Sequence, residues 1–123
     1  MLPAGFVRAA AESLRDDPVL AFNLLSDLTC VDRYPLEPRF ELQYHLTSMS
    51  RAQKVRLRVV LPGGDPLIDS VTSVWPGANW LEREVFDLFG VRFQGHPDLR
   101  RIILPDDWEG HPLRRDYAVE GPR

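Results

Sequence analysis

Two adjacent segments of the chain alternate between apolar and polar residues, and this alternation constrains the fold more than any other feature. Residues 40–47 alternate without interruption. Residues 54–61 alternate apart from Val60, with basic residues at the other three polar positions. A period of two with one polar face is typical of an antiparallel sheet that is wet on one side. The apolar positions, which we expect to face the core, are Phe40, Leu42, Tyr44, Leu46, Val55, Leu57, Val59 and Leu61.

The link between these segments, residues 48–53, is short enough for a hairpin, so antiparallel pairing is predicted. On the exposed face, Glu41 of one strand is expected to pair with Arg56 or Arg58 of the other. The run Pro-Gly-Gly-Asp-Pro at residues 62–66 is a strong turn signal that ends this part of the sheet.

A helix is predicted before the hairpin, because apolar residues recur at helical spacing over residues 6–16. Its stripe consists of Phe6, Ala10 and Leu14, with Val7 and Ala11 beside it. Residues 22–32 are compatible with a third strand. The residues expected to share one parity in that strand are Leu24, Leu28 and Cys30.

A second helix is predicted after the turn Trp-Pro-Gly at residues 75–77. Asn79 is a natural N-cap with Glu82 at the third helical position, as in a capping box. The apolar stripe is formed by Leu81, Val85, Leu88 and Phe89. Arg83 and Asp87 are spaced for an ion pair along the helix, and Gly90 is expected to end it.

The amino-acid composition changes after residue 93. Prolines recur among charged residues from there to residue 123. Such a segment is neither a regular helix nor a central strand, so we expect an extended arm. The sequence therefore predicts an α+β fold. Residues 1–93 form a core domain, with a small mostly antiparallel sheet and helices packed on one face, and residues 94–123 form a long irregular C-terminal docking segment.

Composition narrows the function classes. The chain of 123 residues has a net charge of −3, no apolar run long enough to cross a bilayer and no visible secretory signal. This charge gives no reason to expect nucleic acid as a partner. A single cysteine, Cys30, allows neither an intrachain disulfide nor a cysteine-ligated iron–sulfur cluster, and its apolar surroundings indicate a small buried core residue.

The sequence gives only weak support for a catalytic function. Metal-ligand residue types gather in the tail, at His96, Asp98, His111 and Asp116, but no spacing fixes two of them on one rigid face. Aromatic residues and arginines are also frequent between residues 75 and 115, a composition typical of protein interfaces. A core of aromatic residues with a solvated charged surface would explain the same composition equally well.

Two stretches carry a family resemblance. Residues 82–93 read Glu-Arg-Glu-Val-Phe-Asp-Leu-Phe-Gly-Val-Arg-Phe, and a run from Gly95 to Tyr117 follows, with a histidine and a basic–apolar series at set distances. Together they resemble the signature of the 30 kDa subunit family (the C subunit) of respiratory NADH:quinone oxidoreductase (complex I). Residues 24–29 and 75–80 are similar to the family as well, so the resemblance covers essentially the whole chain.

The resemblance implies a non-catalytic subunit in the peripheral arm of a proton-translocating enzyme, on the cytoplasmic side of the bacterial inner membrane. It implies no cofactor in this chain, because FMN and the iron–sulfur clusters belong to partner subunits and quinone is the substrate of the complex. The expected partners are the 49 kDa subunit at the quinone site and an adjacent iron–sulfur subunit. Interface or structural roles are implied for Glu82, Arg83, Glu84, Asp87, His96, Asp98, Arg100, Arg101, Asp106, Trp108, His111, Arg114, Asp116 and Tyr117.

Other functions stay open at this point. Relatives of the family also serve membrane-bound hydrogenases and F420-linked complexes. A stand-alone enzyme with a metal at His96, Asp98, His111 and Asp116 is a second class. A homodimeric binding module that exchanges its C-terminal arm between copies is a third.

Overall fold

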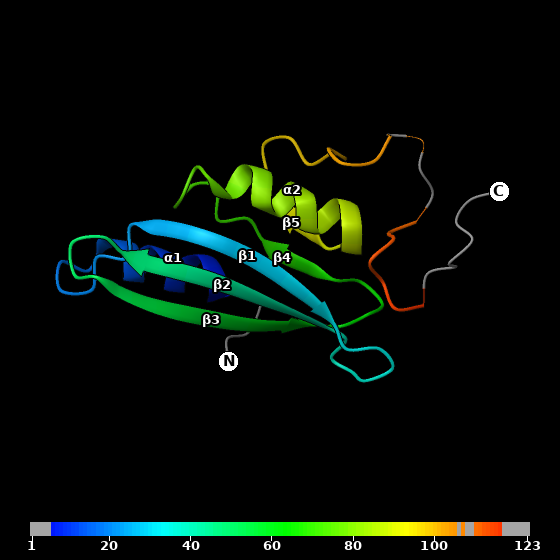
Figure 1. The fold of residues 1–123 in the computed structure, drawn as a ribbon, viewed down its shortest axis with the longest axis horizontal. Helices are drawn as coiled ribbons and strands as arrows, with labels where there is room; N and C mark the ends of the chain where they lie inside the picture. The colour runs from blue at the N-terminus through cyan, green and yellow to red at the C-terminus, as the bar shows by residue number, and fades with distance from the viewer. Residues whose placement is uncertain (1–5, 106, 108–109, 117–123) are drawn as a thin grey trace.

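The two alternating segments form the centre and one edge of a three-stranded antiparallel sheet in the computed structural model of the chain, which describes residues 6–105, 107 and 110–116 (Figure 1). The strands are β1 (Leu24–Asp32), β2 (Phe40–Ser48) and β3 (Gln53–Leu61), and they lie in sequence order. Each strand pairs with its neighbour in the sequence, as the short connecting links predict.

The central strand confirms its predicted faces. Phe40, Leu42, Tyr44 and Leu46 are almost completely buried. On the opposite face Glu41 accepts a charge-assisted hydrogen bond from Arg58, the cross-strand pair expected from the sequence.

The edge strands depart from strict alternation. In β3 only Val59 and Leu61 are buried, while Val55 is 36% exposed. In β1 the register shifts between Leu25 and Asp27. This bulge places Leu25 in the core and turns Leu24 outward, so the predicted parity of Leu24, Leu28 and Cys30 is wrong at its first member.

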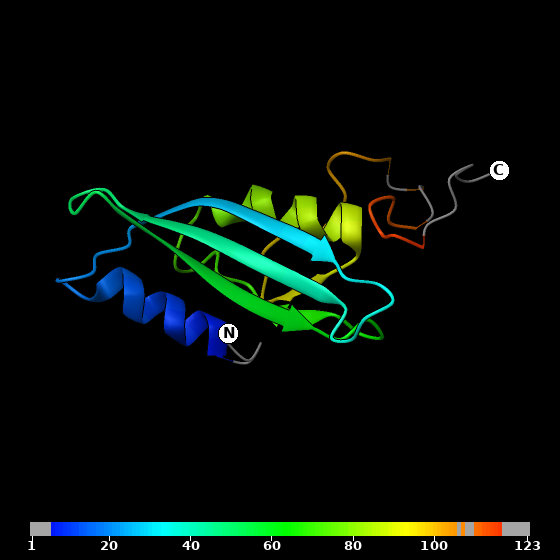
Figure 2. The same ribbon diagram turned by 60° about the horizontal axis from the view of Figure 1, so that its bottom comes forward.

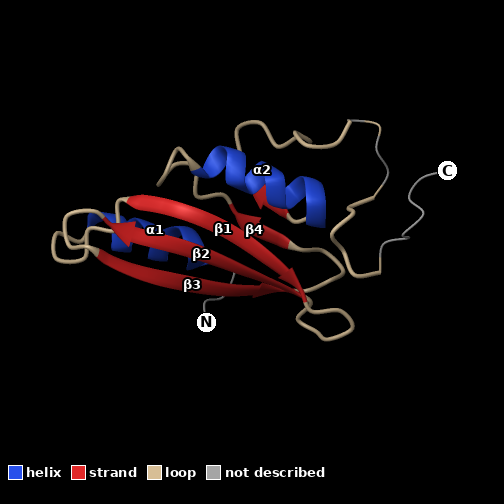
Figure 3. Ribbon diagram, viewed as in Figure 1, coloured by secondary structure: helices blue, strands red, loops and turns tan. Residues whose placement is uncertain are grey.

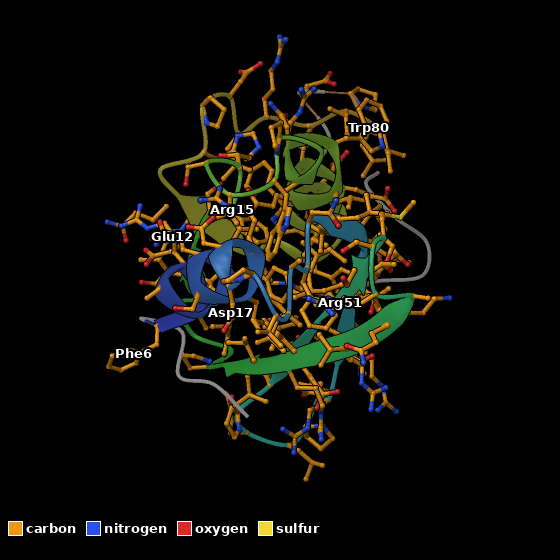
Figure 4. The ribbon with its side chains drawn as sticks, turned by 90° about the vertical axis from the view of Figure 1, so that its left-hand side faces the viewer. Phe6, Glu12, Arg15, Asp17, Arg51 and Trp80 are labelled. Carbon is orange, nitrogen blue, oxygen red and sulfur yellow. The ribbon has the colours of Figure 1, made fainter. Side chains whose placement is uncertain are left out.

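Two helices, α1 (Val7–Asp16) and α2 (Ala78–Phe89), lie on the same side of the sheet (Figure 4). Figure 2 shows α2 beside β1, with α1 toward the β3 side. A short parallel pair, β4 (Leu67–Asp69) with β5 (Arg92–Gln94), completes this layer (Figure 3). The α+β class with helices on one face is therefore confirmed, but the parallel pair was not predicted from the sequence.

The first helix buries a different stripe from the one predicted. It begins at Val7, and its buried residues are Val7 and Ala11, whereas Phe6 precedes the helix and is 63% exposed. Val7 and Ala11, which were predicted to lie beside the apolar stripe, thus form its centre. Among the described residues, no helix has the length and apolar character that a bilayer crossing requires.

Candidate interface around helix α2

Helix α2 begins without the predicted capping box. Its N-cap is Gly77, no side chain caps it, and Asn79 already lies inside the helix. The preceding turn feeds directly into the helix, with the backbone N–H of Ala78 bonded to the carbonyl of Trp75. Glu82 is consequently free of a capping role, and the prediction that assigned it one is wrong.

Glu82 instead points into the core, where its side chain is fully buried. One carboxylate oxygen accepts a hydrogen bond from the Ser70 hydroxyl at 2.6 Å, and the other accepts the Val71 backbone N–H at 2.8 Å. The nearest basic group is His96, whose Nε2 lies 4.0 Å from the carboxylate and contacts the carbonyl of Asn79. Burial raises the pKa of Glu82 to about 7, since the two hydrogen bonds only partly offset desolvation.

Asp87 is the second buried carboxylate of α2, further along the helix. Its Oδ2 accepts the backbone N–H groups of Ile102, Ile103 and Leu104 at 2.8–3.2 Å. Its Oδ1 accepts from the Arg101 guanidinium at 2.7 Å. Burial alone would raise the pKa of Asp87, but these donors outweigh it and hold the pKa below its ordinary value.

The predicted ion pair between Arg83 and Asp87 is therefore wrong. Asp87 turns inward to the tail, and Arg83 lies with its guanidinium 5.9 Å from the centre of the Trp80 ring. The carboxylate finds more donors in the backbone of residues 102–104 than a single surface arginine would offer.

The tail returns to the C-terminal end of α2. His111 Nδ1 lies 2.9 Å from the carbonyl of Asp87, the Leu113 backbone N–H donates to the carbonyl of Leu88, and Arg114 Nε donates to the carbonyl of Phe89 at 2.6 Å. These contacts satisfy carbonyls that the end of a helix leaves without partners. Burial lowers the pKa of His111.

Gly90 makes this return possible. It ends α2 in the left-handed conformation predicted for it, with φ +80°. A Cβ at this position would lie 2.6 Å from Cδ2 of His111 and 2.7 Å from Nη2 of Arg114. The residue is thus required both for the backbone turn and for the close approach of the tail.

We expect Gly90→Ala to lower the free energy of unfolding by about 1–2 kcal/mol from backbone strain alone. The clash should also displace residues 111–114 from α2. Urea unfolding and amide exchange at Leu113 measure the two effects. Gly64→Ala is the control, because a Cβ at Gly64 meets nothing within 4 Å. Equal behaviour of the two variants would contradict this role of Gly90.

A charged network ties the tail to the sheet. Arg39 donates to Asp32 through Nε and Nη2 at 2.7 and 2.8 Å, and also to Asp116 at 2.6 Å. Asp32 further accepts the backbone N–H of Arg115. The hydrogen bonds from Arg39 hold the pKa of Asp32 well below its ordinary value. The guanidinium groups of Arg39 and Arg114 lie 5.0 and 5.1 Å from the centre of the Phe40 ring.

The signature residues thus divide into two sets. Glu82, Asp87, His96, Arg101, His111, Arg114 and Asp116 make contacts within the chain. Arg83 and Glu84 are half-buried, Arg83 beside Trp80, and Asp98 and Arg100 form an exposed pair with each other. Asp106, Trp108 and Tyr117 lie outside the described residues.

The four residues of the metal hypothesis are held apart by these contacts. His96 contacts the start of α2, His111 its end, and Asp116 the network at Arg39. Within the described ranges, no three His, Cys, Asp or Glu side chains are grouped so that they could hold a metal ion.

Sequence reasoning missed Ser70, Asp32 and Arg39, which hold the signature carboxylate Glu82 and the tail. No motif or spacing marks these three residues. Their partners lie 7 to 83 positions away in the sequence, so only the fold brings them together. Cys30 packs against the core but is only partly buried, and burial raises the pKa of its thiol to about 12.

The chain is similar to known proteins in both sequence and fold. The profile of the family described as "Respiratory-chain NADH dehydrogenase, 30 Kd subunit" matches residues 2–123. The C subunit of the NADH-quinone oxidoreductase of Roseiflexus sp. strain RS-1 is 53% identical over 109 residues, covering 89% of this chain and 63% of that protein. The protein of the same name from Geobacter sulfurreducens is 53% identical over 104 residues, covering 84% of this chain and 64% of that protein. The chain thus spans less than two thirds of these curated relatives.

Two solved structures are similar. The trypsin-resistant fragment (1-134) of Nqo5 has a TM-score of 0.72 and 36% identity, covering 80% of this chain and 79% of the fragment. A chain of the membrane-bound sulfane sulfur reductase, an archaeal respiratory membrane complex, has a TM-score of 0.81 and 27% identity, covering 96% of this chain and 69% of its own. The profile match over residues 2–123 includes both the sheet and the signature helix, and the chain belongs to the 30 kDa subunit family of respiratory-chain NADH dehydrogenases.

Proposed function

We propose that this chain is a docking subunit of a proton-translocating NADH:quinone oxidoreductase and supports electron transfer from NADH to quinone through assembly alone. The observation that carries the proposal is the use of the signature residues. The buried ones build a rigid junction between α2 and the tail, and this junction presents exposed side chains such as Trp80, Ile103 and Leu113 to a partner. Exposed apolar residues on an ordered frame are typical of interaction surfaces.

The chain's own chemistry supports a role without a cofactor. A cysteine-ligated iron–sulfur cluster needs several thiolates, and the sequence has one cysteine. Burial also raises the pKa of the Cys30 thiol to about 12, which disfavours the thiolate form that binds metals. In this proposal, FMN and the clusters reside in neighbouring subunits, and quinone is the substrate of the whole complex.

The proposed partners are the 49 kDa subunit at the quinone site and an adjacent iron–sulfur subunit. The proposed location is the peripheral arm, on the cytoplasmic side of the bacterial inner membrane. The relatives are named as C subunits of NADH-quinone oxidoreductases, which supports the proposal that the chain belongs to such a complex. The tail from residue 94 onward, with its described part clamped to the sheet by Asp116 and Arg39, is the proposed docking segment.

A related respiratory complex is the second candidate. It is favoured by the TM-score of 0.81 to the chain from the archaeal sulfane sulfur reductase. The identity of 27% to that chain is well below the 53% shared with the relative from Roseiflexus sp. strain RS-1, so the NADH enzyme is the first choice.

Affinity purification of the tagged chain from native membranes tests the proposal. We expect the subunits of an NADH:quinone oxidoreductase to copurify in constant ratio, with NADH-dependent quinone reduction in the eluate. The isolated chain should show no flavin or iron–sulfur absorption. Copurification with a complex that reduces sulfur compounds instead of quinone would support the second candidate. Purification of the chain alone, or of a chromophore bound to it, would contradict both.

A further inference from the structure

A groove runs between strand β1 and helix α2, on a side of the molecule that neither β2 nor α1 covers. It has a volume of about 270 Å³. Its apolar lining comes from three parts of the chain and consists of Leu28, Cys30, Val85, Leu88, Phe89 and Leu113. Leu113 at its end is 52% exposed, although its backbone is fixed to α2.

The size of the groove indicates what it accepts. Pockets for cofactors and drug-sized ligands occupy about 300–1,000 Å³ and bury most of the ligand. This groove is smaller and open along its length, so it fits side chains presented by a polypeptide. Its walls are held by hydrogen bonds from Leu113 and Arg114 to the last carbonyls of α2, so the shape exists before a partner arrives.

The rim of the groove is acidic. Asp27 of β1 and Glu84 of α2 line it on opposite sides. Neither carboxylate belongs to an ion pair among the described residues. Arg114, which follows the lining residue Leu113, already contacts the carbonyl of Phe89 and the ring of Phe40. A partner with lysine or arginine at this point would supply the missing charge.

An anchor residue continues the surface along α2. Trp80, Glu84 and Leu88 follow one another at i, i+4 and i+8, so they share one stripe of the helix. Trp80 is 56% exposed, and Figure 4 shows it at the α2 end of the molecule, away from α1. Tryptophan is among the residue types that contribute most to binding energy at interfaces.

We propose that the β1–α2 groove holds a segment of a neighbouring subunit in which a lysine or arginine stands between apolar side chains. The basic side chain lies between Asp27 and Glu84, the apolar ones contact Leu88 and Leu113, and Trp80 closes one end. This inference rests on the proposed function, because it names the surface by which the chain joins the complex.

Charge reversal at the rim tests the groove. We expect the tagged double variant Asp27→Lys with Glu84→Lys to enter the membrane complex on the order of tenfold less than wild type when the two are expressed together. The matched control is Glu12→Lys with Asp65→Lys, which changes net charge equally at exposed acids outside the groove. It also removes the exposed pair of Asp65 with Arg92, which contributes little to stability, so it should enter like wild type. Quantitative mass spectrometry of the purified complex gives the ratio, and unfolding curves of both variants confirm that they fold.

The outcomes separate the two proposals. If wild type joins no redox complex, the proposed function fails. If wild type and the groove variant join equally well, the function stands and the groove assignment is overturned. Equal loss in both double variants would also overturn it, because net charge rather than the rim would then govern assembly.

Cross-linking identifies the occupant. A photoreactive maleimide on Glu84→Cys, in a Cys30→Ser background, should capture a peptide of one neighbouring subunit that carries lysine or arginine among apolar residues. The same reagent on Lys54→Cys, on the open face of the sheet, should not capture that peptide. An acidic peptide, a peptide of a second copy of this chain, or no adduct from a complex that contains the variant would overturn the proposal.

Discussion

Replacing Asp87 with alanine is expected to lower the free energy of unfolding by about 3–5 kcal/mol. The carboxylate accepts the N–H groups of Ile102, Ile103 and Leu104, together with the guanidinium of Arg101. Its removal leaves all of these donors, which are part-buried, without their partner. Such a loss is a large part of the about 5–15 kcal/mol that stabilises an ordinary domain.

Two measurements check this expectation. Urea unfolding gives the free energy, and amide hydrogen exchange at Ile103 and Leu104 reports whether the tail leaves α2. The matched control is Asp98→Ala, which removes an exposed carboxylate paired only with Arg100 and should cost less than about 1 kcal/mol. A loss of similar size in both variants, or retained protection at Ile103 in Asp87→Ala, would show that the carboxylate does not organise the tail.

Glu82→Gln is expected to stabilise the protein at pH 8 by about 3 kcal/mol relative to wild type, with little difference at pH 4. Burial raises the pKa of Glu82 to about 7 from an ordinary value of 4.5. Glutamine fits the same hydrogen bonds: its oxygen accepts from Val71, and its amide donates to the Ser70 hydroxyl oxygen, which can turn its proton toward Thr72.

The direction of this pH dependence follows from the number of protons bound in the folded and unfolded states. Between about pH 4.5 and 7, the folded state retains the proton of Glu82 while the unfolded state loses it, so this group's contribution to stability declines as pH rises through that window. The variant lacks the titration, so its stability should depend less on pH than that of wild type. Unfolding curves at pH 4, 6 and 8 measure the two slopes. Glu84→Gln, at a half-buried position of the same helix, is the matched control and should keep the wild-type slope. Parallel slopes for wild type and Glu82→Gln would refute the buried titration.

The hairpin and the helix end were predictable because their signals are local. Alternation identified the inner face of β2, and Gly90 marked the end of α2. The wrong predictions arise where the position of one residue is compatible with two local patterns. Glu82 has capping spacing and also suits a buried carboxylate, and the choice depends on Ser70, which lies 12 positions upstream. The local sequence pattern does not show that Ser70 and Glu82 come into contact.

The resemblance named residues for interface or structural roles. Their place at an interface stays a prediction, and their arrangement within the chain was not visible in the sequence. The resemblance named Asp87, Arg101 and Arg114, and the structure brings them together at the end of α2. The i,i+4 spacing is visible in the sequence, so Asp87 was assigned to a pair on its own helix. A contact with residues 101–104, which lie 14 to 17 positions further along and beyond Pro97, is not visible. The β1 bulge likewise has no mark in the sequence, and it reverses the face of Leu24.

The tie between Asp32 and Arg115 joins residues 83 positions apart. Ribosomes add about 5–20 residues per second, so roughly 4–17 s separate the synthesis of the two residues. During that interval the hairpin of β2 and β3 already has both of its strands, while the wall contributed by Leu113 does not yet exist. The groove between β1 and α2 is therefore complete only after Leu113 has been synthesised, and until then a nascent chain cannot bind a partner through it.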